Sequence, residues 1–77
     1  MIRIEAKALF IDDEHRTAVV TVITIRCIYQ VAIRNSEITV VGPGVEEKYF
    51  LDEDIPLNLT REGQAMMAVI LFEEDDE

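Results

Sequence analysis

The single histidine of the chain, His15, follows three consecutive acids and is the first candidate for chemistry. Asp12, Asp13 and Glu14 supply carboxylates, and carboxylates together with imidazole are ligands for divalent cations. The spacing lacks the central glycine of a calcium loop and the second histidine of common zinc sites. We therefore expect no metal or other cofactor and interpret the segment as a polar, solvated turn.

Cys27 is the only cysteine, and with His15 as its base it could be the nucleophile of a hydrolase. Because side chains alternate along a strand, Ile25 and Tyr29 share its face, and that face is apolar. A thiol in such surroundings behaves as a small hydrophobe and is unreactive. A lone cysteine also excludes an intramolecular disulfide, which fits a reducing compartment.

Three further patterns lack the context that catalysis needs. Ser36 lies outside a Gly-x-Ser-x-Gly sequence, and the loop Gly42-Pro43-Gly44 has no following Lys-Ser/Thr of a phosphate loop. The carboxylate pairs Glu46 with Glu47 and Asp52 with Asp54 lie in polar segments, whereas acid–base catalysis needs a cleft that separates their pKa values. A chain of 77 residues has one small core and little capacity for such a cleft, so we expect no enzyme.

The charge of the chain is strongly negative and unevenly distributed. Sixteen acids oppose seven bases, which gives a net charge of −9 and a pI near 4.4. Such a chain would be repelled by DNA, RNA and anionic lipid, so direct binding to any of them is not expected. Residues 1–36 carry a net charge of +1 and residues 37–77 carry −10, which suggests an interaction surface in the second half.

The N-terminal residues alternate charged and apolar side chains and lack the apolar core of a signal peptide. No apolar run approaches the roughly 18–20 residues that are needed to cross a bilayer. The expected localisation is cytoplasmic, and the host cytoplasm if a phage encodes the protein.

The acidic residues of the second half are open to two interpretations. They could serve only solubility, with the last five residues as an acidic tail. Alternatively, they could imitate a nucleic acid, because carboxylates at i and i+2 on a strand are about 6.6–7 Å apart and DNA advances about 3.4 Å per charge on each strand. The partner would then be a basic nucleic-acid-binding protein. The residues expected to contact it are Glu46, Glu47, Asp52, Glu53, Asp54, Glu73, Glu74, Asp75 and Asp76.

Apolar residues alternate with polar ones along most of the chain, which indicates short strands separated by polar turns. The strands are expected at residues 2–10, 17–34, 37–41 and 45–51. Because eighteen residues exceed the usual strand length of about 3–10, the second segment should bend sharply or break into two strands near Arg26.

Residues 60–72 fit two structures. A helix capped by Thr60 suits the Ala, Met and Leu content, but Gly63 would lie in its first turn. We favour a hairpin with Gly63 at a left-handed bulge position, followed by a buried strand. The prediction is a mainly β fold, a small antiparallel barrel or sandwich of about six short strands, with one short C-terminal helix as the alternative. It forms one compact domain, residues 1–72, followed by an acidic tail, residues 73–77.

The chain has more apolar residues than one face of a small sheet can bury. Val20, Val22 and Ile28 fall on the face of their segment opposite to the expected core, which predicts a homodimer interface. A structural or assembly subunit that acts through apolar surface is therefore the alternative function.

In size, acidity and lack of motifs the chain resembles the small inhibitors that phages encode, including anti-restriction and anti-CRISPR proteins. The resemblance lies in composition and not in particular residues, so it transfers no functional residue. It implies a non-enzymatic inhibitor that blocks a basic nucleic-acid-binding partner by mimicry.

Overall fold

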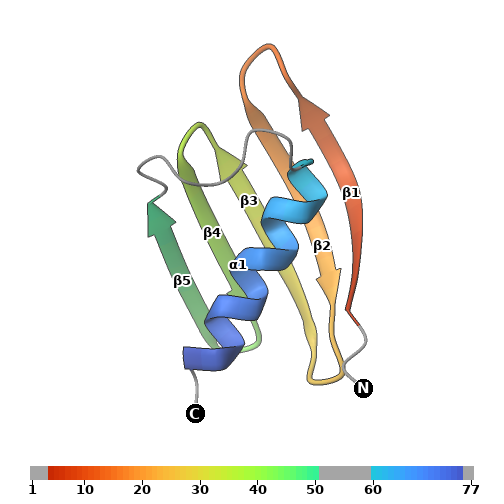
Figure 1. Ribbon diagram of the computed structural model, residues 1–77, viewed down its shortest axis with the longest axis vertical. Helices are drawn as coiled ribbons and strands as arrows, with labels where there is room; N and C mark the ends of the chain where they lie inside the picture. The colour runs from red at the N-terminus through yellow and green to blue at the C-terminus, as the bar shows by residue number, and fades with distance from the viewer. Residues whose placement is uncertain (1–3, 51–59, 76–77) are drawn as a thin grey trace.

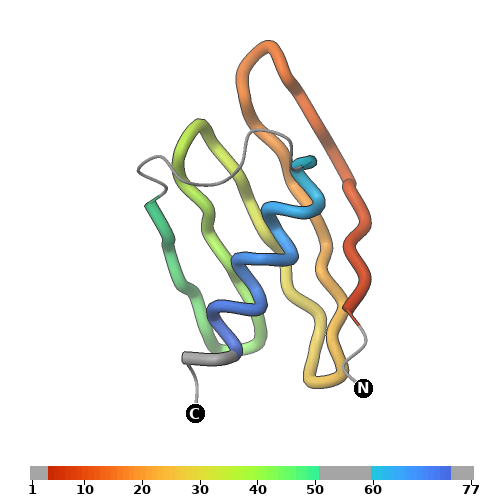
Figure 2. Tube along the Cα trace, viewed as in Figure 1, coloured from red at the N-terminus to blue at the C-terminus, as the bar shows by residue number. Residues whose placement is uncertain are grey.

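The computed structural model describes residues 4–50 and 60–75 and has a mainly β fold with one C-terminal helix (Figure 1). Five antiparallel strands form one sheet in the order β1-β2-β3-β4-β5, and the sheet is not closed into a barrel. The helix α1 crosses one face of this sheet diagonally (Figures 1 and 2). The elements are β1 (Glu5–Asp12), β2 (Thr17–Ile23), β3 (Ile28–Arg34), β4 (Glu37–Gly42), β5 (Val45–Phe50) and α1 (Arg61–Asp75).

The long apolar segment breaks into β2 and β3 near Arg26, as predicted. Thr24 builds the bend between them, because its hydroxyl oxygen accepts hydrogen bonds from the backbone N–H groups of Arg26 and Cys27 at 3.1 and 3.2 Å. Its own N–H donates to the Cys27 carbonyl at 3.0 Å. One polar side chain therefore satisfies the backbone groups that the sheet leaves unpaired.

The hairpin favoured for residues 60–72 is wrong, because this segment is helical. Thr60 caps the helix: its hydroxyl oxygen accepts a hydrogen bond from the Gly63 N–H at 3.1 Å. Gly63 thus lies in the first turn, where its N–H is satisfied by the cap. The residues that pack on the sheet follow the helical spacing i, i+3, i+4, i+7 and are Ala65, Ala68, Val69 and Phe72.

The face of the sheet beneath α1, here called the covered face, holds the core. Val20 and Val22 on β2 are fully buried there, so the prediction that they form surplus surface is wrong. The reason is the bend: Ile23 pairs with Ile28 across four intervening residues, so even positions of β2 and odd positions of β3 share one face. Ile28 lies on the opposite face and is exposed.

The opposite face of the sheet, here called the open face, has no described element packed on it (Figure 1). It carries both charged and apolar side chains, and the burial of strand residues alternates accordingly, most regularly along β3. The molecule is therefore a two-layer structure of one helix on one sheet rather than a sandwich of two sheets.

The helix extends through Asp75, so the predicted boundary between domain and acidic tail at residue 72 falls inside α1. Residues 76–77 lie outside the described residues. Within residues 4–50 and 60–75, no helix is long and apolar enough to span a membrane.

Candidate functional site

The acids predicted to bind a partner do not all lie on one face. Glu46 and Glu47 are adjacent on β5 and exposed. Glu47 pairs with the buried Val40 and therefore points to the covered side of the sheet, whereas Glu46 pairs with the exposed Val41 on the open face. Asp52, Glu53, Asp54 and Asp76 lie outside the described residues.

Tyr29 connects the start of β5 to the C-terminal end of α1. Its hydroxyl donates a hydrogen bond to the Glu73 carboxylate at 2.9 Å. Its ring lies against Gly42, where an added Cβ would be 2.7 Å from a ring carbon, and Gly42 pairs with Val45 at the β4–β5 turn. The last turn of α1 and the first residues of β5 are thereby brought to the same end of the molecule (Figure 1).

We call this region the acidic end and define it by Glu47 and by the last turn of α1, whose sequence contains Glu73, Glu74 and Asp75. It joins acids that are more than 25 residues apart in the chain. The last turn of α1 contains no basic residue, although the partial negative charge of a helix C-terminus favours bases there. An acid in the last turn of a helix costs about 0.3–1 kcal/mol of helix stability.

The carboxylate of Glu73 is held by the hydroxyl groups of Thr24 and Tyr29. The Thr24 hydroxyl lies 3.1 Å from the same carboxylate oxygen that accepts the Tyr29 hydrogen bond. Thr24 has one hydroxyl proton, which it shares between Glu73 and the Cys27 carbonyl at 3.1 Å. These contacts tie the end of α1 to the β2–β3 bend and to β3.

Burial raises the pKa of the Tyr29 phenol well above its ordinary value, and the neighbouring Cys27 thiol and Glu73 carboxylate add to this effect. Tyr29 therefore stays protonated at physiological pH and remains a donor to Glu73. Its ring also packs edge-to-face on Phe72, with ring centroids 5.6 Å apart. Aromatic packing and hydrogen bonds therefore fix the position of the last turn of α1 on the sheet.

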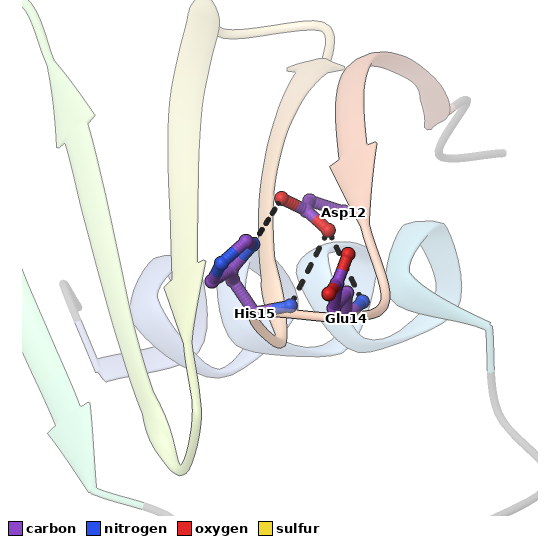
Figure 3. A group of neighbouring side chains, drawn as sticks. All are labelled: Asp12, Glu14 and His15. Atoms are coloured by element: carbon purple, nitrogen blue, oxygen red, sulfur yellow. Dashed lines mark hydrogen bonds and ion pairs between the residues drawn. The ribbon is translucent and has the colours of Figure 1, made fainter.

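A second group of acids lies at the β1–β2 turn. Asp12, Glu14 and His15 place their potential ligand atoms within 4.8 Å of one another (Figure 3). One Asp12 oxygen accepts the N–H groups of Glu14 and His15 at 3.1 and 3.3 Å, and the other lies 2.7 Å from His15 Nδ1. Both oxygens are therefore used to build an Asx-type turn.

The hydrogen bond from His15 holds the pKa of the Asp12 carboxyl below its ordinary value. His15 and Cys27 lie beyond opposite ends of β2, so the cysteine–histidine pair considered from the sequence is not assembled. Ser36 and the segment Gly42-Pro43-Gly44 lie at hairpin turns. Gly44 has a φ of 74° and supplies the left-handed conformation that the β4–β5 turn requires.

Comparison with known proteins finds no match to this chain among family models, curated proteins or solved structures.

Proposed function

We propose that the protein is a non-enzymatic binding protein that uses its acidic end to contact a basic, nucleic-acid-binding partner. The observation that carries this proposal is that the Tyr29–Glu73 hydrogen bond holds the last turn of α1 at the end of the sheet where β5 begins, and that Glu47 on β5 points to the same side of the sheet as α1 (Figure 1). Acids from two elements and the negative end of the helix dipole lie in one region, and their fields add.

The cost of this arrangement supports a binding role. Acids in the last turn of a helix oppose the dipole, and solubility alone would be served equally well by acids at positions without that cost. Local choices that work against stability concentrate at functional sites. The anchor formed by Thr24, Tyr29 and Glu73 gives the acids a rigid base, which lowers the entropy lost on binding.

The mode of action that we propose is inhibition by nucleic-acid mimicry, as in the phage-encoded inhibitors that the chain resembles in composition. A basic groove that accepts phosphates would accept a rigid set of carboxylates by the same electrostatic attraction. Such binding is fast and weakens with salt. Asp52, Glu53 and Asp54 are proposed to extend the contact.

The test is capture of basic proteins from the lysate of the source cell, with washes from about 0.05 to 1 M salt and with competing duplex DNA. One triple variant removes charge from the acidic end: Glu47→Gln, Glu74→Gln and Asp75→Asn. Its matched control removes three charges at the opposite end: Asp13→Asn, Glu14→Gln and Glu62→Gln. Glu73 is left unchanged because it holds the fold.

We expect a nucleic-acid-binding protein that wild type and the control both capture, that moderate salt or DNA releases, and that the acidic-end variant loses. Equal capture by the two variants would contradict a binding role for the acidic end. Binding that survives high salt and added DNA would contradict mimicry and favour an apolar contact.

The second candidate function is that of a structural or assembly subunit. It is favoured by the apolar side chains on the open face and on the outer side of α1, where Met67, Ile70 and Leu71 are partly exposed. In that case the acids would contribute solubility only.

A further inference from the structure

We propose that the open face of the sheet is a homodimer interface and that a second copy of the chain packs on it face to face. This proposal goes beyond partner binding and does not rest on it. It also differs from the dimer predicted from the sequence, because Val20 and Val22 lie under α1 and only Ile28 is on the open face.

The open face exposes a large amount of apolar surface. Five large apolar side chains on it are 38–71% exposed: Phe10, Ile23, Ile28, Val41 and Phe50. They come from all five strands, so the apolar character extends across the whole sheet. Sheets in stable domains usually bury such a face against a second layer.

The charge on the open face is nearly balanced, although the whole chain carries a net charge of −9. The strand register places four acids and three bases there: Glu5, Asp12, Glu37 and Glu46, with Lys7, Arg34 and Lys48. Glu37 forms an ion pair with Lys48 at 3.3 Å and is the cross-strand partner of Arg34. Two copies can therefore approach through this face with far less repulsion than through any acidic surface.

One pair of charges at the two edges of the face is complementary. Lys7 on β1 and Glu46 on β5 belong to one row across the sheet, which runs through Thr21, Gln30 and Val41. In the proposed dimer a two-fold axis lies between the two sheets and runs parallel to the central strand β3. β1 of one copy then lies over β5 of the other, and each row of residues faces the same row of the second copy. Lys7 then faces Glu46 of the second copy, and the same contact occurs twice in the dimer.

One central row of the face suits close approach of two sheets, whereas in the row through β3 residue Arg34 the axis places this side chain opposite Arg34 of the second copy. The next row runs from Phe10 through Val19, Ala32 and Thr39 to Lys48, so its middle residues are small or β-branched. Five strands at about 4.8 Å spacing and about 20 Å length give a planar area of roughly 500 Å² per copy. Two copies reach about 1,000 Å², the lower limit for a specific interface, so we expect association that depends on protein concentration.

The experiment is sedimentation velocity of the full chain over a range of concentrations, with Lys7→Glu, Glu46→Lys and the double variant. Each single reversal creates two like-charge contacts per dimer and should raise the dissociation constant at least about tenfold. The double variant restores opposite charges and should return to within about threefold of wild type. Glu47→Lys is the matched control, because it makes the same charge change on β5 but faces the other side.

The expected dimer persists in about 1 M salt, because apolar burial is not screened. A wild-type chain that stays monomeric at millimolar concentration would overturn the proposal. So would a double variant that fails to recover while its unfolding curve matches wild type. A dimer that Leu71→Glu separates and the reversals at Lys7 and Glu46 leave intact would place the interface on α1 instead.

These outcomes are independent of the proposed function. Partner capture is read as salt-sensitive binding of a basic protein, whereas self-association is read on the purified chain alone. Failure to capture a partner would not contradict self-association, and failure to self-associate would not contradict partner binding.

Discussion

The two faces of the sheet are formed by alternating residues of the same strands, but they differ in how much they contribute to the stability of the fold. On the covered face Val20, Val31 and Val40 are completely removed from solvent by α1. Their neighbours on the open face include Val41, which stays accessible, and charged residues of both signs. The free energy of folding should therefore depend mainly on the covered face, whereas the open face stays accessible to solvent.

The largest expected effect tests this difference within one strand. Ile33 on β3 is buried on the covered face, and Ile28 on the same strand is exposed on the open face. Ile33→Ala should lower the free energy of unfolding by about 2–5 kcal/mol, because it leaves a cavity in the core. Ile28→Ala should cost less than about 1 kcal/mol. Urea unfolding at low protein concentration measures both, and similar losses would contradict the division between the faces.

The next effect concerns the support beneath the acidic end. Gly42→Ala would place a methyl group 2.7 Å from the Tyr29 ring, which is itself held by Glu73. Displacement of this ring should cost about 1–3 kcal/mol of stability. Combining Gly42→Ala with Tyr29→Ala removes the clash, so the glycine change should then cost much less. Thermal unfolding of wild type, the two single variants and the double variant checks this. An unchanged penalty for Gly42→Ala in the Tyr29→Ala background would contradict the contact.

Tyr29→Phe keeps the ring and removes the hydrogen bond to Glu73, so we expect a loss of about 1–3 kcal/mol. The folded state raises the pKa of Tyr29 above its ordinary value of 10.0. The contribution of its protonated phenol to stability is therefore complete below pH 10 and decreases as the pH rises further. The free energy of unfolding should fall less steeply above pH 10 in the Tyr29→Phe variant. Parallel curves for the two proteins would contradict this assignment.

The smallest effect is expected at the β1–β2 turn. Asp12 has a pKa below its ordinary value of 3.8, chiefly because of its hydrogen bond with His15. Its contribution to stability is therefore present above pH 3.8 and is lost as the pH falls through the lowered value. In a carboxyl titration by NMR, His15→Ala should return the pKa of Asp12 toward 3.8. A pKa that does not move would show that the backbone N–H groups hold the carboxylate without help from the ring.

The sequence predicts the strands better than it predicts their packing. Alternation and turn residues locate most strand positions, and the excessive length of residues 17–34 predicts the break near Arg26. The helix is missed because the run from Met66 to Phe72 is apolar at both helical and strand spacing, and because Gly63 suits a bulge. Thr60 and the spacing of Ala65, Val69 and Phe72 were the available signals.

The candidate site is less predictable, because it depends on contacts between distant parts of the chain. The acids themselves are evident from composition, but their separation by face is not. Glu46 and Glu47 point to opposite sides, and which residues of β2 and β3 share the covered face is set by the four-residue bend after β2. Nothing in the local sequence around Tyr29 indicates that it joins Glu73 to Gly42.

The most direct test of the acidic end compares Glu47→Lys with Glu46→Lys in salt-stepped capture of the basic partner. The two variants make the same charge change one residue apart on the same strand, on opposite sides of the sheet. If the acidic end makes the contact, Glu47→Lys should release the partner at distinctly lower salt than Glu46→Lys. Release of the partner at the same salt concentration by both variants would contradict the central claim that the helix-side acids form the binding surface.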